Sequence, residues 1–294
     1  MPELPEVETI RRDLGPQVVG RRITGLHVKR GASRLLLGVP QKQLRDRLSG
    51  RRIDAVGRAG KYLLFYLDDG ASWVVHLRMT GSLRHRPQDA PPDDFLRAVV
   101  PLDDGAELRF TDIRKFGTFE VVDDIAAVTS RLGPEPLTLA FTEDVLATVV
   151  AGRQAPLKSV LLDQRRVAGL GNIYVDESLF LAGLHPSVPA GSLRAEECAR
   201  LHAAIEQTLR EGIAHRGASF RDYTDADGRD GNQQHFVRVF RRTGQPCDCC
   251  GGTIQRTVVG GRASHWCPRC QPARQAMRKP RRKPRKNARA TARA

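Results

Sequence analysis

Four cysteines near the end of the chain restrict its fold more than any other feature. They form two Cys-x-x-Cys pairs, Cys247 with Cys250 and Cys267 with Cys270, and 16 residues separate the pairs. Such pairs supply the four thiolates that a tetrahedral structural zinc ion needs. The intervening segment is rich in β-branched residues and has a central Gly-Gly pair, which predicts a β-hairpin. We therefore expect a zinc-finger hairpin that holds one structural Zn2+ ion.

Two further cysteines accompany these four. Cys249 could compete with Cys250 for the metal, although Cys250 gives the first pair the same spacing as the second. Cys198 is expected to be a small buried hydrophobic residue. The acidic N-terminus lacks the apolar segment of a signal peptide, so a disulfide framework is not expected. No run of about 18 apolar residues could span a membrane, and we expect a cytoplasmic protein.

The charge of the chain points to a polyanionic partner. The 294 residues carry a formal net charge of +15. Ten Lys and Arg residues and no acids lie in 271–294, so the remaining chain carries about +5. This basic, Pro-containing tail is predicted to be disordered. It either adds salt-sensitive affinity for DNA or has no defined role.

The pattern of apolar residues divides the chain into a β-rich and a helical part. Residues 1–15 predict a helix that ends at Gly15-Pro16, and the short β-rich segments that follow predict a two-layer β-sandwich. After a break at 133–136 the pattern is helical, with Thr142 as an N-cap and Gly183 as a C-terminal stop. The expected strands are 23–28, 53–56, 62–67, 73–77, 108–111 and 118–122, and the later helices include 158–162, 173–182 and 196–211.

The first residues of the chain could have a catalytic role as well as a structural one. Their sequence is Met-Pro-Glu-Leu-Pro-Glu-Val-Glu-Thr. Removal of Met1 would leave Pro2 as a free secondary amine, which forms a permanently cationic iminium when it attacks a sugar carbon. Glu3 is adjacent and could transfer a proton. The same stretch also suits an ordinary helix start, because its apolar residues recur at helical spacing. The two interpretations are compatible, since a packed helix would fix the amine in space.

Further motifs follow in order along the chain: Gly60–Leu63, His76–Gly81, Asp112–Gly117, Gly133–Pro136 and Gly169–Tyr174. Together with the N-terminal stretch and the finger, they resemble the formamidopyrimidine-DNA glycosylases of the Fpg/Nei family. The resemblance covers residues 2–271. Leu4 favours the Fpg (MutM) branch, because the Nei branch resembles Pro-Glu-Gly-Pro-Glu at this place.

The resemblance implies an α+β multidomain fold. An N-terminal β-sandwich with a packed N-terminal helix would precede a helix–two-turn–helix domain that carries the zinc-finger β-hairpin. A Gly-, Asp- and Arg-rich segment, 217–234, is expected to be a long mobile loop that covers the extruded base. The expected divisions are 1–133 for the catalytic sandwich, 134–141 for a hinge, 142–240 for the helical domain with its loop, 241–273 for the finger and 274–294 for the tail.

The resemblance also implies a set of catalytic residues. Pro2 would be the nucleophile, and Glu3 would protonate the sugar ring as it opens. Lys61 would contact the phosphate beside the lesion and assist proton transfer, although a lysine entering a strand is usually a solvated edge residue. Arg262 would grip the phosphates that flank the lesion, with a solvated surface arginine as the alternative.

A second set would contact DNA. Met79, Arg114 and Phe116 would fill the space left by the extruded base, and Arg114 would donate to its orphaned partner. Taken singly, Met79 and Phe116 would be assigned to the sandwich core, but the two motifs that contain them together favour the DNA-contacting role. Asn172 and the preceding glycine turn would bind phosphate, because a helix N-terminus presents free amides. Lys158 would point into the lesion region.

The chain departs from the family pattern in its binding elements. Asp94-Phe95 stands where the family usually has a Lys-His pair, and Phe240 stands where it has a tyrosine that can reach a phosphate. The sequence at the end of the 217–234 loop also differs from that of a common Fpg. These changes spare the implied catalytic residues, so we expect the chemistry to be kept while lesion preference or affinity differs.

These observations predict a bifunctional DNA glycosylase and β,δ-lyase that removes 8-oxoguanine and formamidopyrimidines from duplex DNA. The protein is expected to be a monomer in the bacterial cytoplasm, associated with the nucleoid. One alternative is a Nei-like preference for oxidised pyrimidines. Another is a non-catalytic zinc-finger DNA-binding protein, and an RNA or ribosome binder would explain the tail but not Pro2 and Glu3.

Overall fold

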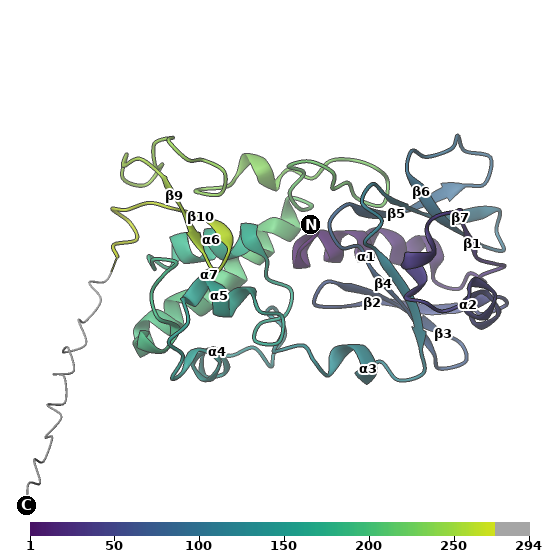
Figure 1. Cartoon of the computed structure of the whole chain (residues 1–294), viewed down its shortest axis with the longest axis horizontal. Helices are drawn as coiled ribbons and strands as arrows, with labels where there is room; N and C mark the ends of the chain where they lie inside the picture. Colours follow the sequence, from purple (N-terminus) through teal and green to yellow (C-terminus); the bar gives the residue numbers. More distant parts are fainter. Residues whose placement is uncertain (274–294) are drawn as a thin grey trace, which may run out of the picture.

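The computed structural model describes residues 1–273, and the predicted tail 274–294 lies outside the described residues. The fold is α+β, as expected, with a strand-rich N-terminal part and a helical C-terminal part (Figure 1). The N-terminal elements are α1 (Leu4–Val18), β1 (His27–Val28), α2 (Gln41–Leu48), β2 (Ile53–Ala59), β3 (Tyr62–Leu67), β4 (Ser72–His76), β5 (Gly81–Pro87), β6 (Leu96–Pro101), β7 (Ala106–Asp112), β8 (Thr118–Val122) and α3 (Ala126–Thr129).

Two four-stranded antiparallel sheets make up the expected sandwich. Their strand orders are β1-β6-β7-β5 and β2-β3-β4-β8. Helix α1 shares one hydrophobic core with both sheets, and its Val7, Ile10 and Leu14 side chains have no exposed surface. The apolar stripe predicted for the first helix is therefore confirmed, and burial of this stripe fixes the start of the chain against the sandwich.

The end of α1 was predicted wrongly. The helix passes through Gly15 and Pro16 and continues to Val18, whose side chain is fully buried in the core. A proline usually disfavours helical backbone at the residue before it, because its ring meets that residue's Cβ. Gly15 has no Cβ, so the helix can continue for one more turn.

Several elements of the sandwich were not expected. The strands β5 and β6 and the helix α2 were missed, and β1 occupies only the last two residues of the expected strand 23–28. In β5 the stretch Gly-Ser-Leu-Arg-His-Arg-Pro has a single large apolar residue, so its sequence lacks the alternation that marks a strand. In α2 only Leu44 and Leu48 are buried, too few to give a recognisable stripe.

The helical part has its own core, and its predicted helices are present. They are α4 (Glu143–Val150), α5 (Leu157–Leu162), α6 (Asn172–Leu181) and α7 (Ala195–Ala214). Thr142 caps α4 as predicted, since its hydroxyl accepts a hydrogen bond from the Val145 amide at 3.3 Å. The N-cap of α6 is Gly171, so the helix begins one residue earlier than the expected 173–182. Gly183, at φ +69°, ends α6 as predicted.

The segment that joins the two parts is held by an ion-pair chain. The Arg58 guanidinium on β2 pairs with Glu8 of α1 at 3.1 Å and with Glu135 of the linker at 2.7 Å. Glu135 also accepts a hydrogen bond from the Gly60 amide. The linker is thereby tied to the sandwich, and the proposed hinge over 134–141 stays a prediction.

The loop 217–234 is packed, which differs from the mobile loop expected from its composition. Tyr223 and Ala226 belong to the hydrophobic core of the sandwich. At the start of the loop, Arg216 pairs with Asp225 at 2.5 Å and with Asp13 of α1 at 2.7 Å. Because this loop leaves α7 and returns over α1, it joins the helical part to the sandwich (Figure 1).

The finger is the predicted hairpin. β9 (Gln255–Val259) pairs antiparallel with β10 (Arg262–Trp266). Gly260 and Gly261 form the turn with φ values of +56° and +75°, in the left-handed region that a two-residue hairpin turn requires. Within residues 1–273, no helix is both long enough and apolar enough to cross a membrane.

Candidate active site

The start of the chain is buried and held by a capping box. Pro2 and Glu3 both have almost no exposed surface, and Glu3 is the N-cap residue of α1. Its amide donates to the Glu6 carboxylate at 2.7 Å. The usual sequence signature of such a box has Ser, Thr, Asp or Asn at the N-cap, and here Glu3 takes that place. Glu6 was missed as a site residue, because a glutamate at the N-cap does not match this rule.

The Glu3 carboxylate lies at the N-terminus of α6. It accepts hydrogen bonds from the amides of Ile173 at 3.0 Å and Tyr174 at 3.4 Å. The sequence predicted a phosphate site at this glycine turn, but these two amides bind the protein's own carboxylate. Gly171 has to be a glycine here, since a Cβ would lie 2.3 Å from the Glu3 carboxyl carbon.

The first residue of α1 interlocks with the same turn. The Leu4 amide donates to the Gly169 carbonyl at 3.0 Å. Gly169 has φ +87°, and a Cβ there would come within 2.7 Å of the Leu4 side chain. The Gly-Leu-Gly-Asn motif is therefore a close-contact surface for the N-terminus.

Burial gives the two charged groups of this site unusual affinities for protons. It raises the pKa of Glu3 to about 7, partly offset by the nearby Lys61 ammonium, while Glu6 raises it further. Burial also lowers the pKa of Lys61, against the opposing effect of Glu3 and Glu6. A carboxyl group with a pKa near 7 exists in both forms at neutral pH, as a proton donor and acceptor requires.

Lys61 is not a solvated edge residue. Its side chain is buried at the start of β3, directly after Gly60, which turns the chain at φ +56°. Gly60 packs against Ala168 and Gly169 of the helical part. The lysine thus points into the interior where both parts of the molecule meet the N-terminus.

The finger approaches the site through one backbone carbonyl. The Ala263 oxygen accepts from Asn172 Nδ2 at 3.1 Å and from Lys158 Nζ at 2.7 Å. Lys158 is fully buried and also pairs with Asp176 at 2.6 Å. The predicted roles of Asn172 and Lys158 in binding DNA are untested, and here both side chains anchor β10.

Asp176 and His265 form the other half of this anchor and were not predicted. The second Asp176 oxygen accepts from the His265 amide and lies 2.9 Å from its Nδ1 atom. These bonds fix β10, whose first residue is the exposed Arg262. Arg262 lies close enough to Lys61 to lower the pKa of that amine, which places the guanidinium at the edge of the site.

Three residues expected to enter DNA form one group on the sandwich. Arg114 lies 3.0 Å from the Met79 sulfur, and its guanidinium is 4.8 Å from the centre of the Phe116 ring. Met79 is 41% exposed and Phe116 is half-buried, so Met79 is not part of the sandwich core. We call these three residues the wedge group.

The wedge group is positioned by Asp112, which was not predicted. Its carboxylate accepts from the amides of Arg114 at 3.0 Å, Phe116 at 2.7 Å and Gly117 at 2.8 Å, and from the Thr80 hydroxyl. A buried carboxylate with this many donors holds the turn in one shape. Its place at the head of the Asp-Ile-Arg-Lys-Phe-Gly motif is the sequence signal that could have revealed it.

The four predicted cysteines come together as a metal site. Their sulfur atoms all lie within 4.8 Å of one another, with Cys247 3.8 Å from Cys270 and Cys250 3.4 Å from Cys267. Tetrahedral zinc–thiolate bonds of about 2.3 Å place sulfur atoms ~3.8 Å apart, so the set fits one structural zinc ion. Cys249 is exposed and outside the cluster, which settles the choice between Cys249 and Cys250.

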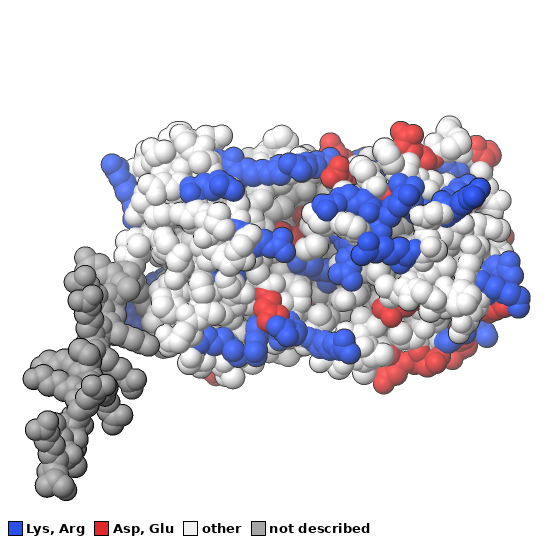
Figure 2. Space-filling model, viewed as in Figure 1, with Lys and Arg blue, Asp and Glu red and all other residues white. Residues whose placement is uncertain are grey.

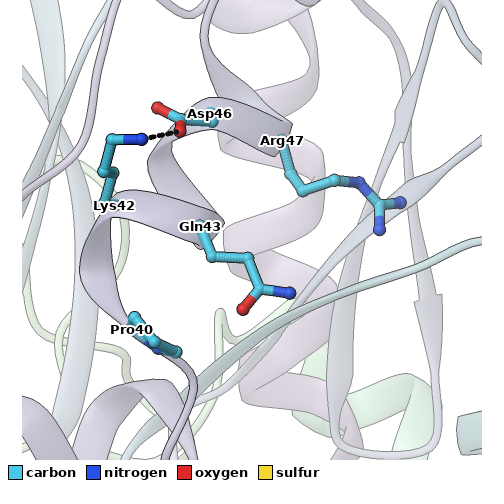
Figure 3. Close-up of a pocket in the computed structure, with 5 residues that line it drawn as sticks. All are labelled: Pro40, Lys42, Gln43, Asp46 and Arg47. Carbon is cyan, nitrogen blue, oxygen red and sulfur yellow. Dashed lines mark ion pairs between the residues drawn. The ribbon is translucent and has the colours of Figure 1, made fainter.

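Lys and Arg side chains are spread over both parts of the molecule on the face that Figure 2 shows. A surface concavity of about 420 Å³ lies elsewhere, on α2. Its lining comes from the 40–47 segment alone, and Lys42 and Asp46 pair across it at 3.5 Å (Figure 3). None of the predicted site residues line this concavity, so it is not the candidate site.

Comparison with known proteins agrees with this arrangement. Residues 1–119 match the formamidopyrimidine-DNA glycosylase N-terminal domain, 132–224 match the H2TH domain of the same enzymes, and 244–273 match the zinc finger found in FPG and IleRS. The chain is 46% identical to a formamidopyrimidine-DNA glycosylase of Chloroflexus aggregans over 273 residues, covering 92% of this chain and 98% of that one. The chain belongs to the formamidopyrimidine-DNA glycosylase family.

Further relatives of this family give the same result. The enzyme of Heliobacterium modesticaldum is 47% identical over 278 residues, with 92% of this chain and 100% of that protein covered. Among solved structures, a Lactococcus lactis FPG mutant bound to Fapy-dG DNA matches with a TM-score of 0.86 and 36% identity, covering 92% of this chain and 100% of that chain. A MutM complex with carbocyclic 8-oxo-G DNA matches with a TM-score of 0.85, 36% identity and the same coverage.

The contact between Gly171 and Glu3 gives a first prediction. In Gly171→Ala, the new Cβ will push the Glu3 carboxyl group out of place, and we expect strand cleavage to slow by about 100-fold. Gly25→Ala is the matched control, because a Cβ there meets only the His27 ring, at an ordinary contact distance of 3.6 Å. Single-turnover rates on a lesion duplex measure the effect, and equal rates for the two variants would contradict this role of Gly171.

The cysteine cluster gives a second prediction. Cys267→Ser is expected to lose its zinc, because a structural site needs all four ligands. Cys249→Ser changes an exposed cysteine that lies between the two ligands of the first pair, and it should keep a full zinc content. Metal analysis of the two purified proteins distinguishes them, and zinc loss from Cys249→Ser would show that the ligand set is assigned incorrectly.

Proposed function

We propose that this protein is a bifunctional DNA glycosylase and abasic-site lyase of base excision repair that removes oxidised purines from duplex DNA. The observation that carries the proposal is the buried Glu3 carboxyl group with its pKa near 7, next to Pro2 and opposite Lys61. Support also comes from the relatives named above, all of them formamidopyrimidine-DNA glycosylases, and from the DNA-bound structures.

In the proposed reaction the Pro2 nitrogen, freed by removal of Met1, attacks the anomeric carbon of the damaged nucleotide. The bond from this carbon to the base breaks, and the base leaves with the bonding electrons and takes up a proton. Glu3 protonates the ring oxygen, and the ring opens to an iminium. Elimination from this cation breaks the phosphate bond on one side of the sugar and then the bond on the other.

The remaining predicted residues would hold the DNA in place. Lys61 would contact the phosphate next to the damaged nucleotide, and Arg262 would hold phosphates from the tip of the finger. The wedge group would occupy the gap in the duplex, where an apolar side chain offsets part of the cost of unstacking. Asn172 at the start of α6 would add a polar contact to the backbone.

The four-cysteine cluster fits zinc as a structural ion. All four ligands come from the protein, so the metal has no open position for substrate, and its contribution is to fold the finger.

We also propose that the protein works on chromosomal DNA in a bacterial cytoplasm. We further propose that domain boundaries follow residues 133, 141, 240 and 273, and that the protein is a monomer.

Replacement of the nucleophile tests the proposal. Borohydride should trap a covalent adduct between the wild-type protein and 8-oxoguanine DNA. Pro2→Gly should still bind this DNA while its strand cutting is lost, because the secondary amine is gone. Pro5→Ala, which changes the nearby proline in the first turn of α1, should cut normally. Full nicking by Pro2→Gly would refute the assignment of Pro2.

The pH dependence gives an independent prediction. Glu3 donates its proton only when neutral, so the cleavage rate should fall as the pH rises through about 7. The positive charge of Lys61 holds the pKa of Glu3 down. Lys61→Met should therefore move this fall in rate, the alkaline limb of the pH–rate profile, to higher pH. Lys61→Arg keeps the positive charge and should leave the limb in place. A limb at the same pH in all three proteins would show that Glu3 is not the donor.

A further inference from the structure

One exposed aromatic side chain near the wedge group has no part in the reaction described above. Phe95 precedes β6, is 53% exposed and has a φ of +55°. Bulky residues rarely adopt this left-handed backbone, which costs free energy. The β6–β7 ladder also shifts register directly afterwards, between Leu96 and Ala98. Such bulges redirect side chains, and here the strained backbone directs an apolar ring towards solvent.

The Phe95 backbone is held by the same residue that holds the wedge group. The Phe95 carbonyl accepts from the Asp112 amide at 3.1 Å, and the Arg97 guanidinium lies 6.0 Å from the centre of the ring. Arg97 in turn donates to the Asp112 carbonyl at 2.7 Å. Asp112 is the residue whose carboxylate holds the turn of Arg114 and Phe116. One residue therefore positions both the ring and the wedge group.

The ring lines a cleft of about 420 Å³ between the sandwich and the loop that packs over it. The sandwich lines the cleft with Thr80 and Ile113, and Asp222 comes from the loop. Ile113 is 47% exposed, so Phe95 and Ile113 form an apolar patch on this otherwise polar face. A cleft of this size is within the range of about 300–1,000 Å³ that holds small planar ligands.

The charges around the Phe95 ring determine which part of a DNA molecule can contact it. Asp94 is adjacent and exposed, whereas the Asp93 carboxylate is taken by Arg84 at 3.3 Å and by Arg109 at 3.2 Å. An exposed carboxylate repels phosphate, so a contact here with the DNA backbone is disfavoured. An aromatic face next to a guanidinium group instead suits the flat surface of a nucleobase.

We propose that Phe95 stacks on a nucleobase of the bound DNA, as a second aromatic contact beside the wedge group. Asp94 keeps the phosphates away from this contact. The inference rests on the proposed function, because it needs DNA with a locally opened duplex on this face. Stacking of this kind tolerates any base, so Phe95 contributes affinity for opened DNA rather than recognition of one sequence.

Binding measurements on the full-length protein test the inference. A duplex with a reduced abasic site is the probe, and fluorescence anisotropy gives the dissociation constant. Phe95→Ala should weaken binding about tenfold, because one stacked base is lost, while Phe95→Trp should bind at least as tightly as the wild type. Tyr66→Ala is the control, since Tyr66 is an aromatic residue, 37% exposed, on the other sheet.

A second measurement locates the contact. 2-Aminopurine placed in turn at each position near the abasic site should change its fluorescence at one position when the wild type binds but not when Phe95→Ala binds, and the electron-donating indole of Phe95→Trp should quench it there. Affinity and 2-aminopurine fluorescence equal to the wild type in Phe95→Ala would overturn the inference. Failure of the proposed function is seen separately, since the wild type would then not nick an 8-oxoguanine duplex at all.

Discussion

The hydrogen bonds between Glu3 and the first amides of α6 are the interaction on which the rest of the structure depends. They bring the start of the chain against a turn about 170 residues later in the sequence. Glu6 extends the same contact, because its carboxylate accepts from the Glu3 amide, the Tyr174 hydroxyl and the Ala218 amide. The sandwich, the helical part and the covering loop therefore meet at two carboxylates of α1.

The groups that hold the fold together around Glu3 also set its protonation. A carboxyl group at a helix N-terminus would ordinarily have a lowered pKa, because the amides stabilise its charged form. At Glu3, burial and the neighbouring Glu6 outweigh the amides and the Lys61 ammonium, and the pKa rises to about 7. The protonation of Glu3 is thus set by opposing effects, and displacement of the turn will change it.

The sequence predicted the parts of the molecule that depend on spacing along the chain. The α1 stripe, the hairpin turn at Gly260-Gly261, the Thr142 cap and the four metal ligands were all predicted, because each obeys a local rule. The strand β5 was missed because polar residues occupy much of its length, and β6 because its short apolar run, Leu-Arg-Ala-Val-Val-Pro, lacks alternation.

Contacts between distant residues could not be predicted in this way. Ala263 accepts from Asn172 and Lys158, and Asp176 accepts from His265, only because the finger folds back on α6. The packing of the loop 217–234 has the same origin. Its Gly- and Asp-rich composition predicts mobility, and only the position of α1 shows where Tyr223 can be buried.

The ion-pair chain through the linker has a mechanical consequence. Because Glu135 is held by Arg58, the linker follows the sandwich as far as that residue, and separating the pair would leave a largely buried guanidinium with only Glu8 as its partner. The ion-pair chain therefore stiffens the connection at its start and confines any bending to the residues after Glu135.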